Sequence, residues 1–236
     1  MDKPNYGVDA PGVVRNLALI GVIGISSRLL LPLVNPSWRN VATSLLWMGI
    51  SCGLAALVMF WSSRVGKFWT RDSLLRAIPW RGDEEVLDVG CGHGLMLIGA
   101  AQRLTTGHAT GIDIWQNEDQ ANNSPQATML NAKLAGVEER VTVRDGDARA
   151  IDAADGAFDL ILSSFAIHNI YDPSERRKAL SEIVRVLKPG GYVGIIDIRH
   201  GLAYRKYFAS NGLSVIRTRV SLLFAIPTYS ILVRKS

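Results

Sequence analysis

The chain has few cysteines, and they are not arranged as metal ligands usually are. Among its 236 residues only Cys52 and Cys91 are cysteines, one in an apolar stretch and one between glycines. Two such positions supply neither a disulfide framework nor the paired spacing of a zinc site. This scarcity argues against the disulfide-stabilised secreted class and is typical of a reducing, cytosolic setting.

Long blocks of basic residues are also missing, although the formal net charge is +5. Lys and Arg are dispersed along the chain, and no aromatic-interleaved RNA-binding motif accompanies them. We therefore expect no nucleic-acid partner. Basic residues beside apolar segments have a simpler partner in anionic lipid head groups.

Charge is absent from one long stretch near the N-terminus. Val41 to Trp61 comprises 21 residues without a charged side chain. At 1.5 Å per residue this run covers about 30 Å, the hydrocarbon thickness of a bilayer. A core helix of that length would carry a polar stripe. The run therefore predicts a transmembrane helix.

An earlier apolar block, Leu17 to Val34, contains Arg28 and Pro32. An arginine costs about 2.5–3.5 kcal/mol at the centre of a span but can snorkel near a helix end. The block is too long for the apolar core of a simple secretory signal. It forms either a helical hairpin with the second block, turning at residues 35–40, or an interfacial helix before one span. We expect the hairpin, which makes residues 1–64 a membrane anchor and the lipid bilayer a partner.

The charges that flank the apolar blocks predict an orientation. Arg64, Lys67, Arg71 and Arg76 follow the second block, whereas Arg39 is alone in the hairpin loop. Positive residues favour the cytoplasmic side. We therefore expect an integral membrane protein whose residues 65–236 form a separate domain on the cytoplasmic side.

A strand-like run, Val86–Val89, leads into three alternating glycines, Gly90-Cys91-Gly92-His93-Gly94, and a helical pattern follows. Glycine permits the positive φ angles of a tight turn and lets a ligand lie against the main chain. The amides that open the helix attract a carboxylate or phosphate. The spacing Gly-x-Gly-x-Gly is not the Gly-x-Gly-x-x-Gly fingerprint of dinucleotide-binding proteins.

Further motifs follow the glycine turn. A short strand at residues 109–114 presents Asp113 about 20 residues after the glycines, where nucleotide-binding units place a carboxylate for ribose hydroxyls. A third strand begins at Arg140 and leads into Gly146-Asp147-Ala148, with Asp145 expected in a turn. A fourth, residues 157–166, is apolar enough to be buried on both faces. Leu187-Lys-Pro-Gly-Gly191 is expected to stop a helix before a fifth strand at residues 192–198.

Together, the glycine turn, Asp113, the Gly-Asp-Ala step and Leu-Lys-Pro-Gly-Gly resemble the class I (Rossmann-like) S-adenosylmethionine-dependent methyltransferases. The resemblance extends over about residues 80–236. It implies an α/β fold with a Rossmann-like, seven-stranded, mostly parallel sheet, flanking helices and a reversed last strand. It also implies S-adenosylmethionine as the cofactor, S-adenosylhomocysteine as its product, and methyl transfer as the activity.

The resemblance implies where the cofactor binds, and no metal site is expected. The residues expected to contact the cofactor are Asp88, Gly90, Cys91, Gly92, His93, Gly94, Asp113, Ile114, Trp115, Asp147, Ala148 and Ser163. In the family, the acid at the position of Asp147 accepts a hydrogen bond from the adenine amine. Trp115 either covers the cofactor or only packs.

The end of the fourth strand faces the transferable methyl group in the family, so Ser163, Ser164, His168 and Asn169 are candidates to line the donor or acceptor pocket. His168 alone among them can act as a base near neutral pH. It is a catalytic base, a substrate or cofactor contact, or a structural residue. Asp197 and His200 are secondary candidates for the acceptor site.

The acceptor itself is not specified by a motif. The chain lacks a tetrapeptide of the Asn-Pro-Pro-Tyr type, which is found in the related enzymes that methylate amines of nucleic acids. It also lacks extra cysteines that would resemble an arsenite-binding set. The predicted anchor favours a lipophilic or small-molecule acceptor: a phospholipid amine, a quinone or other phenol, or a thiol. The alternatives are a membrane-tethered S-adenosylmethionine-binding protein and a methyltransferase acting on RNA or protein. Oligomeric state is not predicted, because Gly49, Gly53 and Ala56 can pack helices within one chain or between two.

Overall fold

The computed structural model describes residues 3–116, 123–223 and 226–236. Its strands form one seven-stranded sheet in the order β3-β2-β1-β4-β5-β7-β6. The strands are β1 (Glu85–Val89), β2 (His108–Asp113), β3 (Val141–Asp145), β4 (Phe158–Ser164), β5 (Leu187–Asp197), β6 (Leu213–Leu223) and β7 (Ile226–Lys235). β7 is antiparallel to both neighbours, and the other neighbouring strands are parallel. The expected α/β sheet with a reversed last strand is confirmed.

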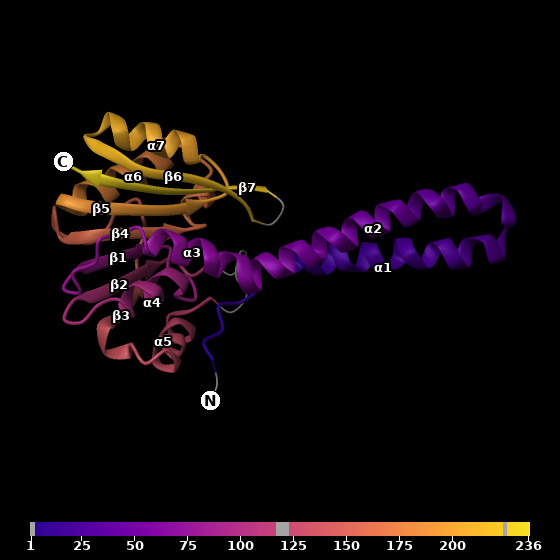
Figure 1. Ribbon diagram of the computed structural model, residues 1–236, viewed down its shortest axis with the longest axis horizontal. Coiled ribbons are helices and arrows are strands. Elements are labelled where there is room, and N and C mark those ends of the chain that lie inside the picture. The colour runs from indigo at the N-terminus through magenta and orange to yellow at the C-terminus, as the bar shows by residue number, and fades with distance from the viewer. Residues whose placement is uncertain (1–2, 117–122, 224–225) are drawn as a thin grey trace.

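Helices cover both faces of this sheet (Figure 1). They are α3 (Lys67–Leu75), α4 (Leu95–Ala101), α5 (Pro125–Leu134), α6 (Pro173–Val186) and α7 (Gly201–Ser210). The first three pack on one face around residues such as Leu97, and α6 and α7 pack on the other around Ile183 and Phe208. Successive residues of β1 point to opposite faces, so Val86 belongs to the first core and Leu87 to the second. The sheet is therefore buried between two helical layers.

Two local predictions need correction. The helix before Leu187–Gly191 ends as expected, α6 stopping at Val186, but the segment itself is the first part of β5, which therefore begins at Leu187 and not at residue 192; its register against β4 is irregular. Glycine permits this because a Cβ at Gly191 would lie 2.7 Å from the backbone oxygen of Asp159. Asp145, predicted in a turn, is the last residue of β3, where its Oδ1 accepts a hydrogen bond of 2.6 Å from Trp115 Nε1.

Helices α1 (Pro11–Val34) and α2 (Arg39–Trp61) form a long hairpin that projects away from the sheet (Figure 1). Their backbones approach closely, since a Cβ at Gly49 would lie 2.9 Å from the Cα of Gly24. The small residues of α2 thus pack against α1 of the same chain. Outward side chains are apolar and exposed, Leu33 by 81% and Leu57 by 69%. Two helices of the described residues, Pro11–Val34 and Pro36–Leu75, are long and apolar enough to cross a membrane.

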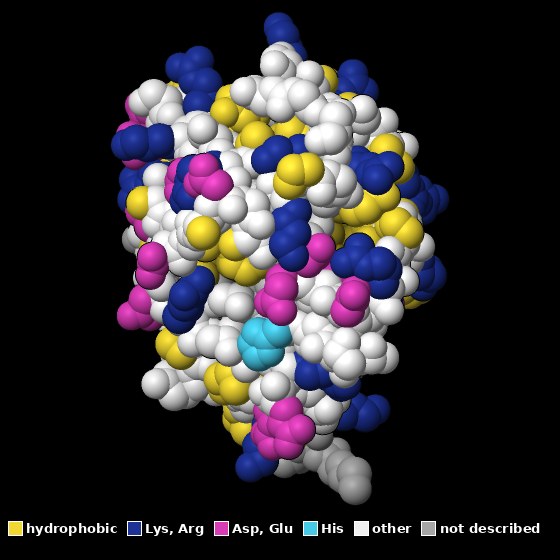
Figure 2. Space-filling model, turned by 90° about the vertical axis from the view of Figure 1, so that its left-hand side faces the viewer, with side chains coloured by type: hydrophobic (Ala, Val, Ile, Leu, Met, Phe, Trp, Pro, Cys, Tyr) yellow, Lys and Arg dark blue, Asp and Glu magenta, His cyan; other side chains and the backbone are white. Residues whose placement is uncertain are grey.

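Both ends of the hairpin are attached to the rest of the protein. Residues 5–10, called here the N-terminal strap, lie against α5 and the α2–α3 junction. The backbone amide of Asn5 donates to Asn131 Oδ1 at 2.8 Å, and that of Asp9 donates to Ser63 Oγ at 3.0 Å. The strap and the start of α3 therefore meet beside the sheet. The face of the molecule farthest from the hairpin carries charged side chains of both signs (Figure 2).

Candidate functional site

A cavity of about 590 Å³ lies where β1, β2 and β4 end. This is the edge at which open α/β sheets bind ligands. Of the residues expected to bind the cofactor, Asp88, Gly90, Cys91, Gly92, His93, Asp113, Ile114, Asp147 and Ala148 line the cavity; Gly94, Trp115 and Ser163 do not. His168, Ser164 and Asn169 line it as well. The structure therefore brings motifs from four parts of the sequence to one space.

The glycine turn forms the floor of the cavity. Gly90, Gly92 and Gly94 have φ angles of 71°, 48° and 84°, which side-chain-bearing residues rarely adopt. The backbone amide of Gly90 donates to the Ile112 carbonyl at 2.8 Å, which fixes the turn against β2. A Cβ on Gly90 would lie 2.2 Å from the Cβ of Ala166. This position therefore needs glycine both for its conformation and for its close approach to the chain after β4.

Asp88 lies under the glycine turn and is only 1% exposed. Its Oδ2 accepts a hydrogen bond of 2.8 Å from the backbone amide of Leu97 in α4. Burial, the largest cause, raises the pKa of Asp88 to about 8. Within the described part of the chain, Asp88 Oδ1 and Ser164 Oγ have no hydrogen-bond partner, and both residues line the cavity. Buried polar atoms without protein partners are places where a ligand can donate or accept.

Asp113 ends β2 and joins two loops at the cavity wall. Its Oδ2 accepts from the Gly92 amide at 2.8 Å, and its Oδ1 accepts from the Trp115 amide at 2.7 Å. Trp115 has a φ of 58°, and its ring lies against Asp145 rather than in the cavity. Ser163 is buried in the sheet, where its Oγ donates to the Val89 carbonyl at 2.9 Å, and the next residue, Ser164, faces the cavity instead.

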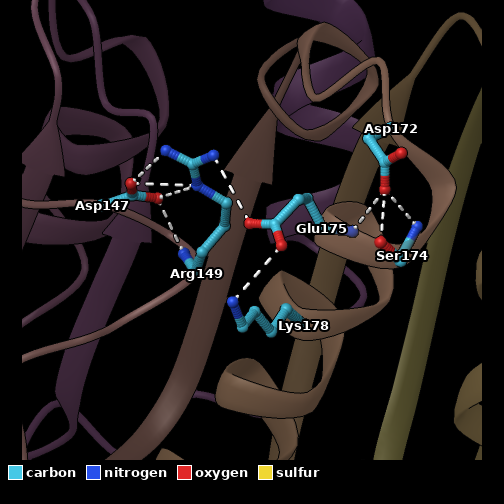
Figure 3. Close-up of polar contacts among 6 residues, drawn as sticks. All are labelled: Asp147, Arg149, Asp172, Ser174, Glu175 and Lys178. Carbon is cyan, nitrogen blue, oxygen red and sulfur yellow. Dashed lines mark hydrogen bonds and ion pairs between the residues drawn. The ribbon is translucent and has the colours of Figure 1, made fainter.

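Asp147 is held by an arginine that sequence reasoning did not identify. Arg149 Nη2 lies 2.6 Å from Asp147 Oδ2, and Arg149 Nη1 lies 3.5 Å from Glu175 Oε2 at the start of α6 (Figure 3). Hydrogen bonds from Arg149 lower the pKa of Asp147. The carboxylate of Asp147 therefore stays ionised at the mouth of the cavity. Nearby, Asp172 caps α6 by accepting a hydrogen bond from the Ser174 amide at 2.7 Å.

A histidine at the other end of the cavity contacts a buried carboxylate that lies behind it. His168 Nδ1 lies 2.7 Å from Asp197 Oδ1, and Asp197 is fully buried. Asp197 Oδ2 also accepts from the His168 amide at 3.2 Å and from the Tyr204 hydroxyl at 3.3 Å. A carboxylate at Nδ1 favours the tautomer whose Nε2 is free to accept a proton. Asp197, a secondary candidate in the sequence, thus belongs to the same site as His168, whereas His200 does not line the cavity.

The N-terminal part of the chain supplies a further wall. Tyr6, Asp9, Met59 and Lys67 line the cavity. Lys67 is 2% exposed, and its Nζ donates to the Tyr6 carbonyl at 2.9 Å and contacts Asp9 Oδ2 at 3.1 Å. Nothing in the sequence marks these residues as part of the site, because their contacts cross 58 positions or more.

The residues present fit S-adenosylmethionine. The cavity offers a bare glycine backbone, buried polar atoms such as Asp88 Oδ1 that have no partner among the described residues, and the carboxylates of Asp113 and Asp147. Carboxylates suit a ligand that carries a sulfonium and an ammonium, since opposite charges attract in a partly buried site. A glycine turn that opens a helix suits the carboxylate of the same ligand.

Known proteins resemble this chain in sequence and in fold. Residues 86–191 match the family model described as a methyltransferase domain. A demethylmenaquinone methyltransferase of Staphylococcus aureus is 34% identical over 132 residues, which are 56% of this chain and 49% of that protein. The chain spans about half the length of the curated relatives it matches.

Two solved structures have a similar fold. The [4+2]-cyclase SpnF has a TM-score of 0.60 at 18% identity, covering 71% of this chain and 80% of that one. A SAM-dependent methyltransferase from Aquifex aeolicus has a TM-score of 0.56 at 20% identity, covering 70% and 89%. These likenesses show the fold alone.

The seven-stranded sheet has the Rossmann-like fold of these solved structures, one of which is described as a SAM-dependent methyltransferase, and residues 86–191 resemble a methyltransferase domain.

Proposed function

We propose that the protein is a membrane-anchored methyltransferase that moves a methyl group from S-adenosylmethionine to a lipophilic quinone in its reduced, phenolic form. The observation that carries this proposal is the His168–Asp197 pair, which lies 2.7 Å apart in a cavity shared with the glycine turn. The relatives named as demethylmenaquinone methyltransferases act, by their name, on a quinone. Among the acceptor classes considered, a phenol makes the best use of a base.

The cofactor would be held by groups on the cavity wall. In this proposal Asp113 accepts from the ribose hydroxyls, Asp147 accepts from the adenine amine, and the amides of the glycine turn face the amino-acid end. S-adenosylmethionine supplies a methyl group on a positively charged sulfur, which becomes a neutral thioether when the methyl leaves. The chain therefore needs to orient the acceptor and manage one proton.

His168 is the proposed base. Its Nε2 takes the phenolic proton of the acceptor, and buried Asp197 stabilises the resulting imidazolium through Nδ1. The phenolate carries negative charge on its oxygen and, by resonance, on the ring carbons beside it. One of these atoms forms the new bond to the methyl carbon as the carbon–sulfur bond breaks. If a ring carbon attacks, the imidazolium returns its proton to the ring oxygen, the methylated carbon loses its own proton to water, and the ring regains aromaticity.

The hairpin of α1 and α2 is the proposed anchor, with the boundary to the methyltransferase domain near residue 64. Its hydroxyl groups are satisfied inside the helices, as in Ser27 Oγ to the Ile23 carbonyl at 2.7 Å and Ser51 Oγ to the Trp47 carbonyl at 2.9 Å. Such bonds suit helices in lipid, where water cannot replace them. Basic residues after α2, such as Arg64, favour a cytoplasmic position for the methyltransferase domain.

The test is methyl transfer by detergent-purified full-length protein. Labelled S-adenosylmethionine is offered with a prenylated hydroquinone, a membrane phospholipid extract, a thiol, and RNA or protein as separate acceptors. We expect label in the hydroquinone and formation of S-adenosylhomocysteine in equal amount. Label in the phospholipid, in the thiol, or in RNA or protein would show that the acceptor belongs to that class and not to the quinones. Cofactor binding without any S-adenosylhomocysteine would favour a membrane-tethered binding protein.

A further inference from the structure

The cavity extends from His168 to the base of the α1–α2 hairpin. Met59, close to the end of α2, and Ile226, the first residue of β7, both line it, as does Ile198 directly after β5. These three side chains are apolar. One wall of the cavity is thus formed by the helix that we propose to span the bilayer.

The path from His168 to this wall is short. Asp197, which contacts His168, pairs with Tyr229 on β7. Ile226 precedes Tyr229 by three residues, and at 3.3 Å per residue it lies about 10 Å beyond the pair. The end of β6 lies against the helix base, since a Cβ on Gly66 would be 2.6 Å from Leu223 Cδ2. A ring bound at His168 therefore leaves any substituent longer than about 10 Å outside the cavity, beside the hairpin.

The outer rim at this point has the composition of a membrane interface. Trp61 and Trp69 are 46% and 62% exposed, and their rings meet edge to face at 5.4 Å. Leu222, near the end of β6, is 73% exposed, and the Arg64 guanidinium lies over the Phe60 ring at 5.5 Å. Tryptophan and arginine at the end of a span lie at head-group depth. The face of the molecule farthest from the hairpin carries charged side chains of both signs, with apolar and uncharged atoms between them (Figure 2).

We propose that the acceptor enters the cavity sideways from the bilayer and keeps its hydrocarbon tail between Met59 and Ile226. The polar ring then lies at His168, and the tail continues along the hairpin into lipid. This inference rests on the proposed function, because it assigns a path to the lipophilic acceptor. It makes the apolar tail, which takes no part in the chemistry, a determinant of specificity.

The experiment compares two acceptors on full-length protein in phosphatidylcholine vesicles. One is a hydroquinone with a long polyprenyl chain, and the other is the same ring with a methyl group in place of the chain. The variants are Ile226→Asn and Met59→Gln, which put polar groups on the path. The matched control is Val215→Asn, because Val215 on β6 is 39% exposed, as Ile226 is 40%, and does not line the cavity.

The quantity measured is the ratio of kcat/KM for the long-chain acceptor to kcat/KM for the short one. We expect each path variant to lower this ratio about tenfold, since a polar group replaces apolar contact with the tail, and we expect Val215→Asn to leave it unchanged. An unchanged ratio in both path variants, or an equal fall in the control, would overturn the proposed entrance. If the wild-type protein methylates neither ring, the proposed function fails, and that result is separate from any change in the ratio.

Discussion

The pairing of His168 with Asp197 predicts a specific loss on replacing Asp197 with Asn. Asn at position 197 retains one acceptor oxygen but lacks the charge that stabilises an imidazolium 2.7 Å away. A hydrogen bond to a charged group contributes about 1.5–3 kcal/mol. At 1.36 kcal/mol per factor of ten, kcat should fall about 10- to 150-fold. The expected change is in kcat, because Asp197 contacts the base and does not line the cavity.

The assay follows labelled methyl transfer at saturating cofactor and acceptor, at one fixed pH, for the wild-type protein and for Asp197→Asn. Calorimetry should give the same affinity for S-adenosylmethionine in both proteins, which separates the chemical effect from misfolding.

The control for this prediction is Tyr204→Phe. It removes the hydroxyl that donates to Asp197 Oδ2 at 3.3 Å and leaves the carboxylate in place. Its loss in kcat should be much smaller than that of Asp197→Asn. The assignment of His168 as a base positioned by Asp197 is refuted if Asp197→Asn retains the wild-type kcat.

Three further predictions concern the cofactor side of the cavity. Gly90→Ala should lower Tm by several degrees and weaken cofactor binding, because φ is 71° and the new Cβ would meet Ala166; an unchanged melting curve would contradict this. The pKa of Asp88 is about 8 in the folded protein and about 3.9 when unfolded. Between these two pH values the native state retains a proton that the unfolded state has lost. The free energy of unfolding should therefore fall as pH rises from about 4 to 8, and Asp88→Asn should flatten that dependence in urea titrations; parallel profiles would count against it. Asn131→Ala removes the hydrogen bonds of 2.8 and 2.9 Å that hold Asn5 and the bond of 3.0 Å to the His93 carbonyl in the glycine turn. Cofactor affinity measured by calorimetry should therefore fall roughly tenfold, and an unchanged Kd would show that these contacts are dispensable.

Much of the fold could be predicted because its signals are local. The glycine turn requires positive φ angles that few other residues tolerate, and Pro125 and Pro173 begin helices at the positions expected of proline. The alternation of strands and helices then fixes which ends of the strands meet. These features depend on residues close together in the chain, which is why sequence reasoning finds them.

The rest of the site depends on contacts that sequence spacing does not encode. Asp197 meets His168 only because β4 and β5 are neighbours in a particular register. Trp115 was expected to cover the cofactor or to pack, and a positive φ turns its ring toward Asp145 instead of the cavity. Residues 115–124 are rich in polar side chains and are expected to form a loop, and residues 117–122 of this segment lie outside the described residues. The N-terminal strap contacts α5 through residues that are 126 positions apart in the sequence, and the periodicity of apolar residues does not indicate a contact over such a separation.

The attachment of the hairpin at both of its ends bears on how the protein can be shortened. The strap holds one end through Asn131, and the other continues into α3, whose Lys67 contacts Asp9 of the strap. Removing residues 1–64 would therefore delete Tyr6, Asp9 and Met59 from the cavity along with the apolar helices. A truncated domain that fails to methylate would lack part of the cavity wall, so its inactivity would not show that catalysis requires a bilayer. The requirement for lipid is separable from the requirement for the hairpin only in a chain that retains the hairpin and is studied without lipid.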